Sequence, residues 1–184
     1  MNNSVIGLDI AKNIFHMYTF DEKKSQPVKK KLKRAELLIF FANYPVSLIG
    51  IEACDGAHHW ARELTKQGHE VILLNARHVK GFVVGNKNDF NDAAAIFDAG
   101  TRPNKRTVSI KTIEQQDIQL VHRIREGLVG KRTALVNQVR GLLSERGIVI
   151  PKGIKKVRVE LPLIFISVPL SIDAVKLTSP QESS

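Results

Sequence analysis

The chain has 184 residues, of which 43% are hydrophobic, and a formal net charge of +10 from 28 Lys and Arg against 18 Asp and Glu. This length suits one ordinary domain with an appendage and a core that needs no disulfide, and the single cysteine excludes an intramolecular one. The excess of positive charge favours a polyanionic partner, because Lys and Arg release counterions when they contact phosphates.

The two ends of the chain give no targeting or membrane signal. The first residues, Met-Asn-Asn-Ser, lack the basic start and apolar stretch of a signal peptide. The apolar stretch at 161–172 is about half a membrane span and contains two prolines. We therefore expect a cytoplasmic protein with no membrane segment.

The first half of the chain predicts a run of strands followed by a helix. Residues 5–10 and 14–20 read as strands joined by a short turn, and the basic stretch 23–34 is compatible with a solvated third strand. Residues 34–44 have helical apolar spacing and stop before a proline, and residues 47–54 form another buried strand.

After these elements, helix and strand alternate. A helix is predicted at 58–67, ending at a glycine, then a strand at 70–74. Residues 79–85 fit either a helix or a loop, and 88–99 form a helix. Three strands followed by helix–strand alternation predict an α/β fold, a mixed sheet with flanking helices, in the order typical of the ribonuclease H-like fold.

A long helix is predicted at 112–146, because this segment contains no proline and is followed by Gly147 and Pro151. At 1.5 Å per residue it would be about 50 Å long, which predicts that it projects beyond a compact domain. A heptad-like seam runs along it, interrupted by two arginines; its positions are Ile118, Val121, Arg125, Leu128, Arg132, Leu135, Val139 and Leu142. The seam predicts pairing with a second subunit, although Gly127 and Gly130 offer a kink that would let the helix fold back.

Two predicted strands each carry one acid. Strand alternation puts Asp9 on the same face as Gly7, and Glu52 on the same face as Gly50. Burying a bare carboxylate is expensive unless it is paired or binds a metal, and the small neighbours predict free room beside the carboxylates. Asp9 is also compatible with a salt bridge to Lys12.

A third acidic element begins the helix at 88–99. Asp89 and Asp92 lie three residues apart, so both carboxylates are on one helix face. By themselves they are better explained as acids that favour the helix N-terminus, with Asn88 as the cap, than as metal ligands. Four acids gathered in one place would repel one another, and hard divalent cations relieve such repulsion. Two ions about 4 Å apart suit phosphoryl transfer on nucleic acid.

Several segments resemble the DEDD insertion-sequence transposases, the family of the Piv/MooV-type recombinases. In chain order, the matching segments are IGLDIAKN at 6–13, GIEACDGAH at 50–58, GHEV at 68–71, GNKNDFNDA at 85–93, EQQD at 114–117, RTALVNQ at 132–138 and RGLL at 140–143. The similarity runs from about residue 5 to about residue 160, with the motifs in the order of the family.

This resemblance implies a RuvC-like N-terminal domain with a catalytic, metal-binding set made of Asp9, Glu52, Asp89 and Asp92. It implies Mg²⁺, with Mn²⁺ as a substitute, and DNA strand cleavage and recombination during insertion-sequence transposition. A structured guide RNA from the element is a further partner that the resemblance suggests. It also implies a C-terminal domain with a nucleophilic serine, which residues 161–184 do not resemble, so we expect a truncated or frameshifted copy that is not self-sufficient.

The resulting domain prediction has three parts: a RuvC-like domain at 1–110, a coiled-coil-like helix at 111–147, and a basic linker with a divergent, partly disordered tail at 148–184. The candidate nucleic-acid-binding residues are Lys12, Lys29, Lys30, Lys31, Lys33, Arg34, Arg125 and Arg132. The β-strand lysines among them fit a solvated sheet edge equally well. Cys54 reads as a small core residue rather than a nucleophile.

Other functions share some of these features. A junction-resolving or ribonuclease H-like nuclease would use the same acids without needing the long helix. An actin-like kinase would need a Gly/Thr-rich phosphate turn after Asp9, where this chain has Ala-Lys-Asn. A non-catalytic nucleic-acid-binding or dimerisation remnant would share the charge and the helix, and metal-dependent cleavage of a branched DNA would distinguish it from the enzymes.

Overall fold

The computed structural model describes residues 4–84 and 88–167. Its strands are β1 (Val5–Asp9), β2 (Ile14–Asp21), β3 (Gln26–Lys33), β4 (Leu48–Glu52), β5 (Glu70–Leu74) and β6 (Thr107–Val108). Its helices are α1 (Leu37–Ala42), α2 (Ala57–Lys66), α3 (Ala76–Val79), the short 3₁₀ turn η1 (Lys80–Phe82), α4 (Asp89–Thr101), α5 (Ile113–Ser144) and α6 (Ile154–Ser167).

The six strands form one mixed sheet in the order β3-β2-β1-β4-β5-β6. β1 pairs antiparallel with β2 and parallel with β4, and β5 continues the parallel part. This order and these directions follow from a three-stranded meander and a helical crossover on each side of β4. The predicted α/β, ribonuclease H-like arrangement with flanking helices is confirmed.

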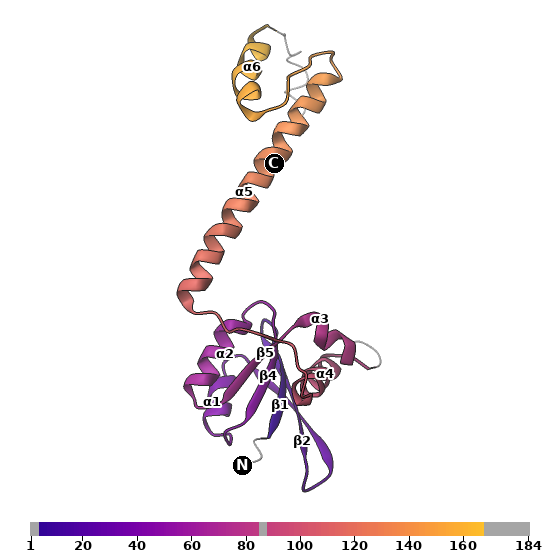
Figure 1. Cartoon of the computed structure of the whole chain (residues 1–184), viewed down its shortest axis with the longest axis vertical. Helices are drawn as coiled ribbons and strands as arrows, with labels where there is room; N and C mark the ends of the chain where they lie inside the picture. Colours follow the sequence, from indigo (N-terminus) through magenta and orange to yellow (C-terminus); the bar gives the residue numbers. More distant parts are fainter. Residues whose placement is uncertain (1–3, 85–87, 168–184) are drawn as a thin grey trace, which may run out of the picture. The chain divides into compact units, whose positions relative to one another are not determined.

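Helices cover both faces of this sheet (Figure 1). Strand alternation sends one set of apolar side chains toward α1 and α2, where they form the larger core. The buried members of that core include Ile6, Leu8, Phe15, Met17, Ile49, Ile51, Phe41, Trp60 and Leu64. On the other face α4 lies across β1, and a smaller cluster holds Leu74, Val79, Ala95, Ile96 and Ala99.

Most predicted elements are present, with differences at the short ones. The basic stretch is a full strand, β3, and the segment that fitted helix or loop contains the end of α3 and η1. β6 and α6 were not predicted. Helix α6 contains Pro162 and replaces the linker that the basic composition suggested. The predicted disordered tail at 178–184 lies outside the described residues.

The chain divides into two compact units, Met1–Gln116, here called the sheet unit, and Asp117–Ser184, the helical unit. In the helical unit, α5 continues unbroken through Gly127 and Gly130, so the kink required for a fold-back is absent. It is followed by Gly147, which has a positive φ of 75°, as the glycine stop signal predicted. The domain boundaries at 110 and 147 stay predictions.

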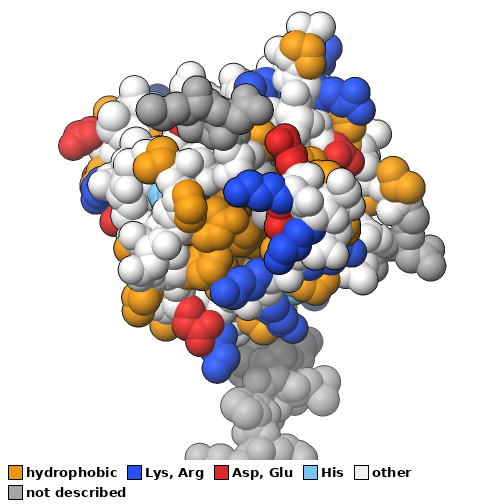
Figure 2. Space-filling view, turned by 90° about the horizontal axis from the view of Figure 1, so that it is seen from below, with side chains coloured by type: hydrophobic (Ala, Val, Ile, Leu, Met, Phe, Trp, Pro, Cys, Tyr) orange, Lys and Arg blue, Asp and Glu red, His pale blue; other side chains and the backbone are white. Residues whose placement is uncertain are grey.

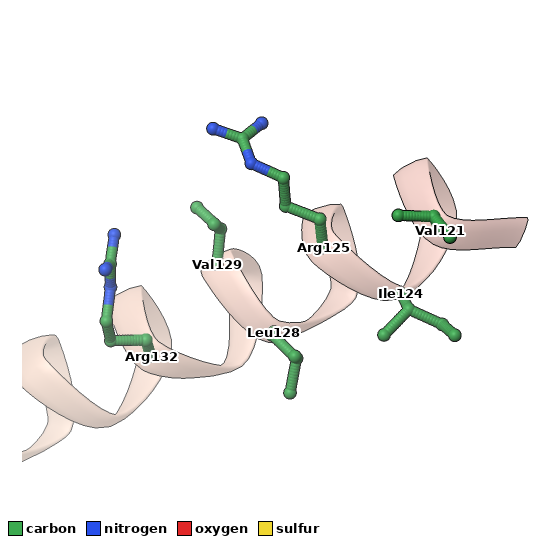
Figure 3. Close-up of a pocket in the computed structure, with 6 residues that line it drawn as sticks. All are labelled: Val121, Ile124, Arg125, Leu128, Val129 and Arg132. Atoms are coloured by element: carbon green, nitrogen blue, oxygen red, sulfur yellow. The ribbon is translucent and has the colours of Figure 1, made fainter. Parts of the chain in front are cut away.

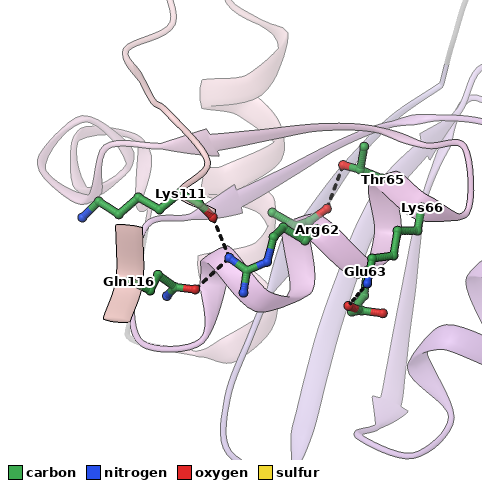
Figure 4. Close-up of polar contacts among 7 residues, drawn as sticks. Arg62, Glu63, Thr65, Lys66, Lys111 and Gln116 are labelled. Atoms are coloured by element: carbon green, nitrogen blue, oxygen red, sulfur yellow. Dashed lines mark hydrogen bonds and ion pairs between the residues drawn. The ribbon is translucent and has the colours of Figure 1, made fainter. Parts of the chain in front are cut away.

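Within the sheet unit, α2 holds the segment that leads into α5. The Arg62 guanidinium donates from one nitrogen to the carbonyl of Lys111 at 2.6 Å and to the side-chain oxygen of Gln116 at 2.7 Å (Figure 4). The backbone N–H of Lys111 donates to Nδ1 of His58 at 3.2 Å. His58 and Arg62 lie one turn apart on α2, so a single helix face fixes residues 111–116.

No helix among residues 4–84 and 88–167 has both the length and the apolar character needed to cross a membrane. The last five residues of the apolar stretch at 161–172 lie outside the described part of the chain.

Candidate metal and nucleic-acid site

Asp9 and Glu52 end two neighbouring strands of the sheet. β1 and β4 are parallel and in register, with Leu8 opposite Ile51, so the two acids that follow leave the sheet side by side. Both lie where strand pairing ends and are partly buried. The carboxyl ends of parallel strands are the usual place for binding residues in α/β sheets.

The glycines beside these acids have a different role from the one that sequence alone suggested. A Cβ added to Gly7 would lie 2.1 Å from the carbonyl oxygen of Ala93 and 2.5 Å from the backbone N of Phe97. Gly7 therefore leaves no free room; it lets the backbone of α4 lie directly on β1. At Gly50 an added Cβ would be 3.3 Å from Leu74, which is also tight. The close approach of α4 is what carries its acids toward Asp9.

The head of α4 supplies Asp89 and Asp92 in its first turn. The side-chain oxygen of Asn88 accepts from the backbone N–H of Phe90 at 3.0 Å, so the predicted N-cap is confirmed. Asp89 is exposed and Asp92 is partly buried. The capping explanation and a convergence on Asp9 are therefore compatible, because α4 begins at the sheet edge where β1 and β4 end.

Electrostatics link the four acids. Burial raises the pKa of Asp9 to about 7, and the negative charges of Asp92, Asp89 and Glu52 add to the rise, in that order. Burial and Asp92 also raise the pKa of Glu52. Among residues 4–84 and 88–167, no Lys or Arg contributes to the shift at Asp9, and Asp9 forms no ion pair with Lys12. The negative charges of the other three acids thus act on Asp9, and that of Asp92 also acts on Glu52.

Four carboxylates are a donor set of oxygen atoms, which is the chemistry that Mg²⁺ and Mn²⁺ prefer. Their uncompensated repulsion is the condition that a divalent cation relieves. Among the described residues, however, no three His, Cys, Asp or Glu side chains are already gathered closely enough to hold an ion. The chemistry of the set fits a divalent cation, and its side chains would have to move closer to enclose one.

A cavity of about 470 Å³ opens beside two of these acids. Glu52 and Asp92 line it together with Arg77 and Lys80, the latter two from α3 and η1. Both basic side chains are exposed. Sequence reasoning missed both: Arg77 lies between the predicted strand at 70–74 and the segment at 79–85, and Lys80 lies in that segment, which fitted helix or loop. The available signal was two basic residues that closely follow a strand.

His16 is a second residue that sequence reasoning missed. It lies on β2 directly opposite Asp9 and is 5% exposed. Its Nε2 is 3.7 Å from a carboxylate oxygen of Asp89, and its ring contacts the ring of Phe90 edge-on with centroids 4.8 Å apart. The signal was a histidine interrupting the apolar run Phe-His-Met, as Asp9 interrupts its own strand.

Cys54 is exposed, so its interpretation as a core residue is wrong. It follows Glu52 by two residues and leaves the sheet at the same edge. Partial burial and the charges of Glu52, Asp9 and Asp55 raise the pKa of its thiol to about 11. The thiol is therefore protonated at neutral pH, which agrees with its exclusion as a nucleophile.

The lysines of β3 do not form one strip. Lys31 pairs with His16 and Lys29 with Tyr18, so these two side chains share the face of Asp9, and the Lys29 ammonium lies 5.9 Å from the centre of the Phe90 ring. Lys30 alternates to the opposite face, where its ammonium lies 4.1 Å from the centre of the Phe40 ring. Strand alternation thus separates Lys30 from the acids.

The other predicted basic residues have varied surroundings. Lys33 is exposed at the end of β3, opposite Ile14, and Lys12 is exposed in the turn after β1. The Arg34 guanidinium lies 4.9 Å from the Trp60 ring and donates to the carbonyl of Lys12 at 3.4 Å, which ties it to the fold. Seen from below (Figure 2), Lys and Arg side chains border a central group of hydrophobic ones. Positive charge is spread over more than one face.

Arg125 and Arg132 belong to α5 and line a groove of about 390 Å³ along that single helix. Figure 3 shows both arginines on the same side as Val129, with Ile124 and Leu128 turned away from them. The arginines therefore flank the apolar seam rather than interrupt it, and Ile124 joins the seam in their place. Each of these side chains is exposed.

The family model DEDD_Tnp_IS110, described as a transposase, matches residues 6–147. This chain belongs to the DEDD transposase family. Among its relatives, the "Probable family 20 transposase" of Pseudomonas aeruginosa is 47% identical over 81% of this chain. The transposase for insertion sequence element IS1111A of Coxiella burnetii is 42% identical over 95% of the chain, and that for IS1328 of Yersinia enterocolitica is 38% identical over 85%.

This DEDD transposase chain spans less than half the length of those relatives, covering 44%, 46% and 47% of them respectively. A comparison with solved structures finds T. thermophilus RuvC in complex with Holliday junction substrate, at a TM-score of 0.40 and 10% identity, covering 58% of this chain and all of that one. The family resemblance read from the sequence motifs is confirmed by the family model and the relatives.

Proposed function

We propose that the sheet unit is the metal-dependent nuclease half of a DEDD transposase, acting on the phosphodiester backbone of DNA. The observation that carries this proposal is the partly buried carboxylate of Asp9, whose pKa is raised by burial and by the charges of Asp92, Asp89 and Glu52. A buried structural acid is usually paired with a cation, whereas in the described part of the chain Asp9 forms no ion pair. The relatives named for insertion sequence elements support DNA as the substrate.

In this proposal Asp9, Glu52, Asp89 and Asp92 hold Mg²⁺, with Mn²⁺ able to replace it. The bound cation would supply charge stabilisation for an attacking and a leaving oxygen. Asp9 and Glu52 provide ligands on the strand ends, and Asp89 and Asp92 complete the set from the first turn of α4. Two strands and one helix of the core thus carry the four carboxylates.

Arg77 and Lys80 would hold the substrate in this proposal. They line the same cavity as Glu52 and Asp92, so a phosphate entering there would lie between acidic and basic walls. Guanidinium and ammonium groups are the common partners of phosphate oxygens in proteins. Lys29 and Lys31 extend the positive charge along the face of the sheet that carries Asp9.

The test is cleavage of a four-way DNA junction and of a linear duplex by the purified chain with Mn²⁺ or Mg²⁺. We expect metal-dependent nicking that Asp9→Asn abolishes and that Arg77→Ala weakens. Cleavage that persists in Asp9→Asn would contradict the proposal, and so would the absence of cleavage by a chain that has bound the metal. The second result would leave a nucleic-acid-binding module.

The polyanion-binding surface is tested by a matched pair of lysines. Lys31→Ala removes a charge on the face of Asp9, and Lys30→Ala removes an equal charge on the opposite face. We expect only the first to weaken DNA binding and to lower the salt dependence by about one counterion. Equal effects of the two variants would assign binding to net charge alone. The same titration with a structured RNA tests the guide RNA that the family resemblance suggests.

We also propose that α5 pairs with the same helix of a second chain. No residue of α5 is fully buried, and Val121, Leu128 and Leu135 each leave about 60% of their surface exposed. Pairing would stabilise a helix whose apolar seam is exposed to solvent, because burying each large side chain contributes about 1.5–3 kcal/mol of free energy. Arg125 and Arg132, beside the seam, would then lie at the rim of the pair or reach a phosphate.

A further inference from the structure

His16 lies beside two acids of the candidate metal site, Asp9 and Asp89, without being one of the acids itself. It extends from β2 beside Asp9 and is 95% buried, since its exposure is 5%. The face of β2 that carries it also carries Tyr18, whose ring is 5.3 Å from that of Phe97 in α4. α4 therefore packs on this face of β2.

His16 contacts two successive residues in the first turn of α4. Its Nε2 is 3.7 Å from an oxygen of Asp89, and its ring meets that of Phe90 at an angle of 80°. The distance to Asp89 is longer than a hydrogen bond, so the two groups approach each other without being locked. The Asp89 side chain is 69% exposed, so most of it faces solvent.

The other nitrogen of His16 is the unusual feature. Nδ1 is buried and has no hydrogen-bond partner in the described part of the chain. A buried polar atom without a partner destabilises a fold, and an apolar ring of the same size would fill this place without that penalty. Packing alone therefore does not account for an imidazole at this position.

We propose that His16 is a positioning residue that holds the Asp89 carboxylate in the direction needed for cation binding. The inference rests on the proposed metal site. Carboxylates that bind metals are themselves commonly held by a neighbouring hydrogen-bond donor, and such partners raise metal affinity. When the carboxylates draw together, a small movement of Asp89 brings its oxygen into hydrogen-bonding range of the Nε2–H.

Two substitutions separate positioning from packing. His16→Phe keeps a ring against Phe90 and removes both nitrogens, so the metal-free protein should be as stable as the wild type or more stable. His16→Gln keeps an N–H donor close to the position of Nε2. Tyr18→Phe is the matched control, because it removes a polar group from the same strand face next to the same helix.

The measurement is the rise in melting temperature of each variant as MnCl₂ is added. For His16→Phe we expect the Mn²⁺ concentration that gives half of the full rise to increase by about 10-fold or more. His16→Gln should restore most of the affinity, and Tyr18→Phe should not change it. A role in stability alone would instead lower the melting temperature of His16→Phe without metal and leave the Mn²⁺ response unchanged.

Three results would overturn the inference. The first is a wild-type Mn²⁺ response in His16→Phe, and the second is a loss of response in His16→Gln equal to that in His16→Phe. The third is a directly bonded nitrogen in the electron spin echo spectrum of Mn²⁺ in the wild type, which would make His16 a ligand. If the wild type itself shows no Mn²⁺ response, the proposed metal site fails first, and the inference fails with it.

Discussion

Gly7 of the sheet unit lies under a helix, whereas the glycines of α5 have open space beside them. An added Cβ at Gly7 would collide with the backbone of α4, but at Gly127, Gly130 and Gly141 it would meet no described atom within 4 Å. The same residue type therefore serves close packing in one region and only weakens the helix in the other. The contrast teaches that the sheet unit positions its acids by its own packing, while the apolar seam of α5 stays exposed, as the proposed pairing requires.

The largest effect is expected from a pair of glycine substitutions. Gly7→Val should destabilise the sheet unit by about 3 kcal/mol or more, because α4 must move off β1. Gly127→Ala should instead stabilise α5 by about 0.5–1 kcal/mol. Denaturant unfolding followed by fluorescence reports on the sheet unit, whose Trp60 is the single tryptophan of the chain and is buried, while circular dichroism follows helix loss. An unchanged free energy of unfolding in Gly7→Val would contradict the close approach of α4 to β1.

The second prediction concerns the seam of α5. Leu135→Glu should raise the dissociation constant of the dimer by at least about 100-fold, because two leucines leave the interface of each pair. Asn137→Glu adds the same side chain about 200° around the helix and is the matched control. Light scattering at several concentrations measures both. A chain that is monomeric at high micromolar concentration before any substitution would end the pairing proposal.

The third prediction is a pH dependence of the metal-free sheet unit. The pKa of Asp9 is raised from 3.8 to about 7 in the fold, so the stability that its protonated form contributes is complete below pH 3.8 and is lost as the pH rises through 7. We expect a loss of about 2 kcal/mol, roughly half of the full shift, because solvent screens this partly exposed carboxylate. Asp9→Asn should flatten the profile and be more stable than the wild type at pH 8. Equal profiles would indicate that the acids do not repel one another.

The smallest effect is expected where α2 holds the segment leading into α5. Burial, Lys111 and Arg62 lower the pKa of His58, whose Nδ1 accepts from the Lys111 N–H. A lowered folded-state pKa means that this contribution to stability is complete above pH 6.5 and is lost as the pH falls through the folded value. Hydrogen exchange of the Lys111 amide should therefore speed up below neutral pH, beyond its intrinsic dependence. His58→Gln should remove that change, and an unaltered wild-type profile would contradict the contact.

The acids were predictable because each breaks an apolar strand or begins a helix. Asp9 and Glu52 are acidic residues in strands that are otherwise apolar and largely buried. Asn88 is a typical N-cap residue, which marks the start of α4. The close packing of α4 on Gly7 was not predictable, because the sequence does not show how closely a helix packs on a strand. Sequence alternation marks which face a residue takes and says nothing of the distance to the next layer.

His16, Arg77 and Lys80 show a second limit. His16 meets Asp9 through the register of a hairpin whose turn does not have a two-residue signature, so the pairing could not be counted from the turn. Arg77 and Lys80 lie in a short helical segment of only a few residues, where periodicity has too few turns to be read. α6 was missed because the basic composition of its segment suggested a linker, and Pro162 lies within the helix.

The central claim is that the sheet unit gathers four carboxylates to bind a divalent cation, and its most direct test is thermal unfolding with increasing Mg²⁺. Because the cation would bind only the folded state, a concentration about 100 times the dissociation constant should stabilise the wild type by about 2.7 kcal/mol, and its melting temperature should rise by roughly 5 °C or more. Asp9→Asn should start from an equal or higher melting temperature at pH 8 and show almost no rise. An unchanged wild-type melting temperature in millimolar Mg²⁺, or an equal rise in Asp9→Asn, would contradict the claim.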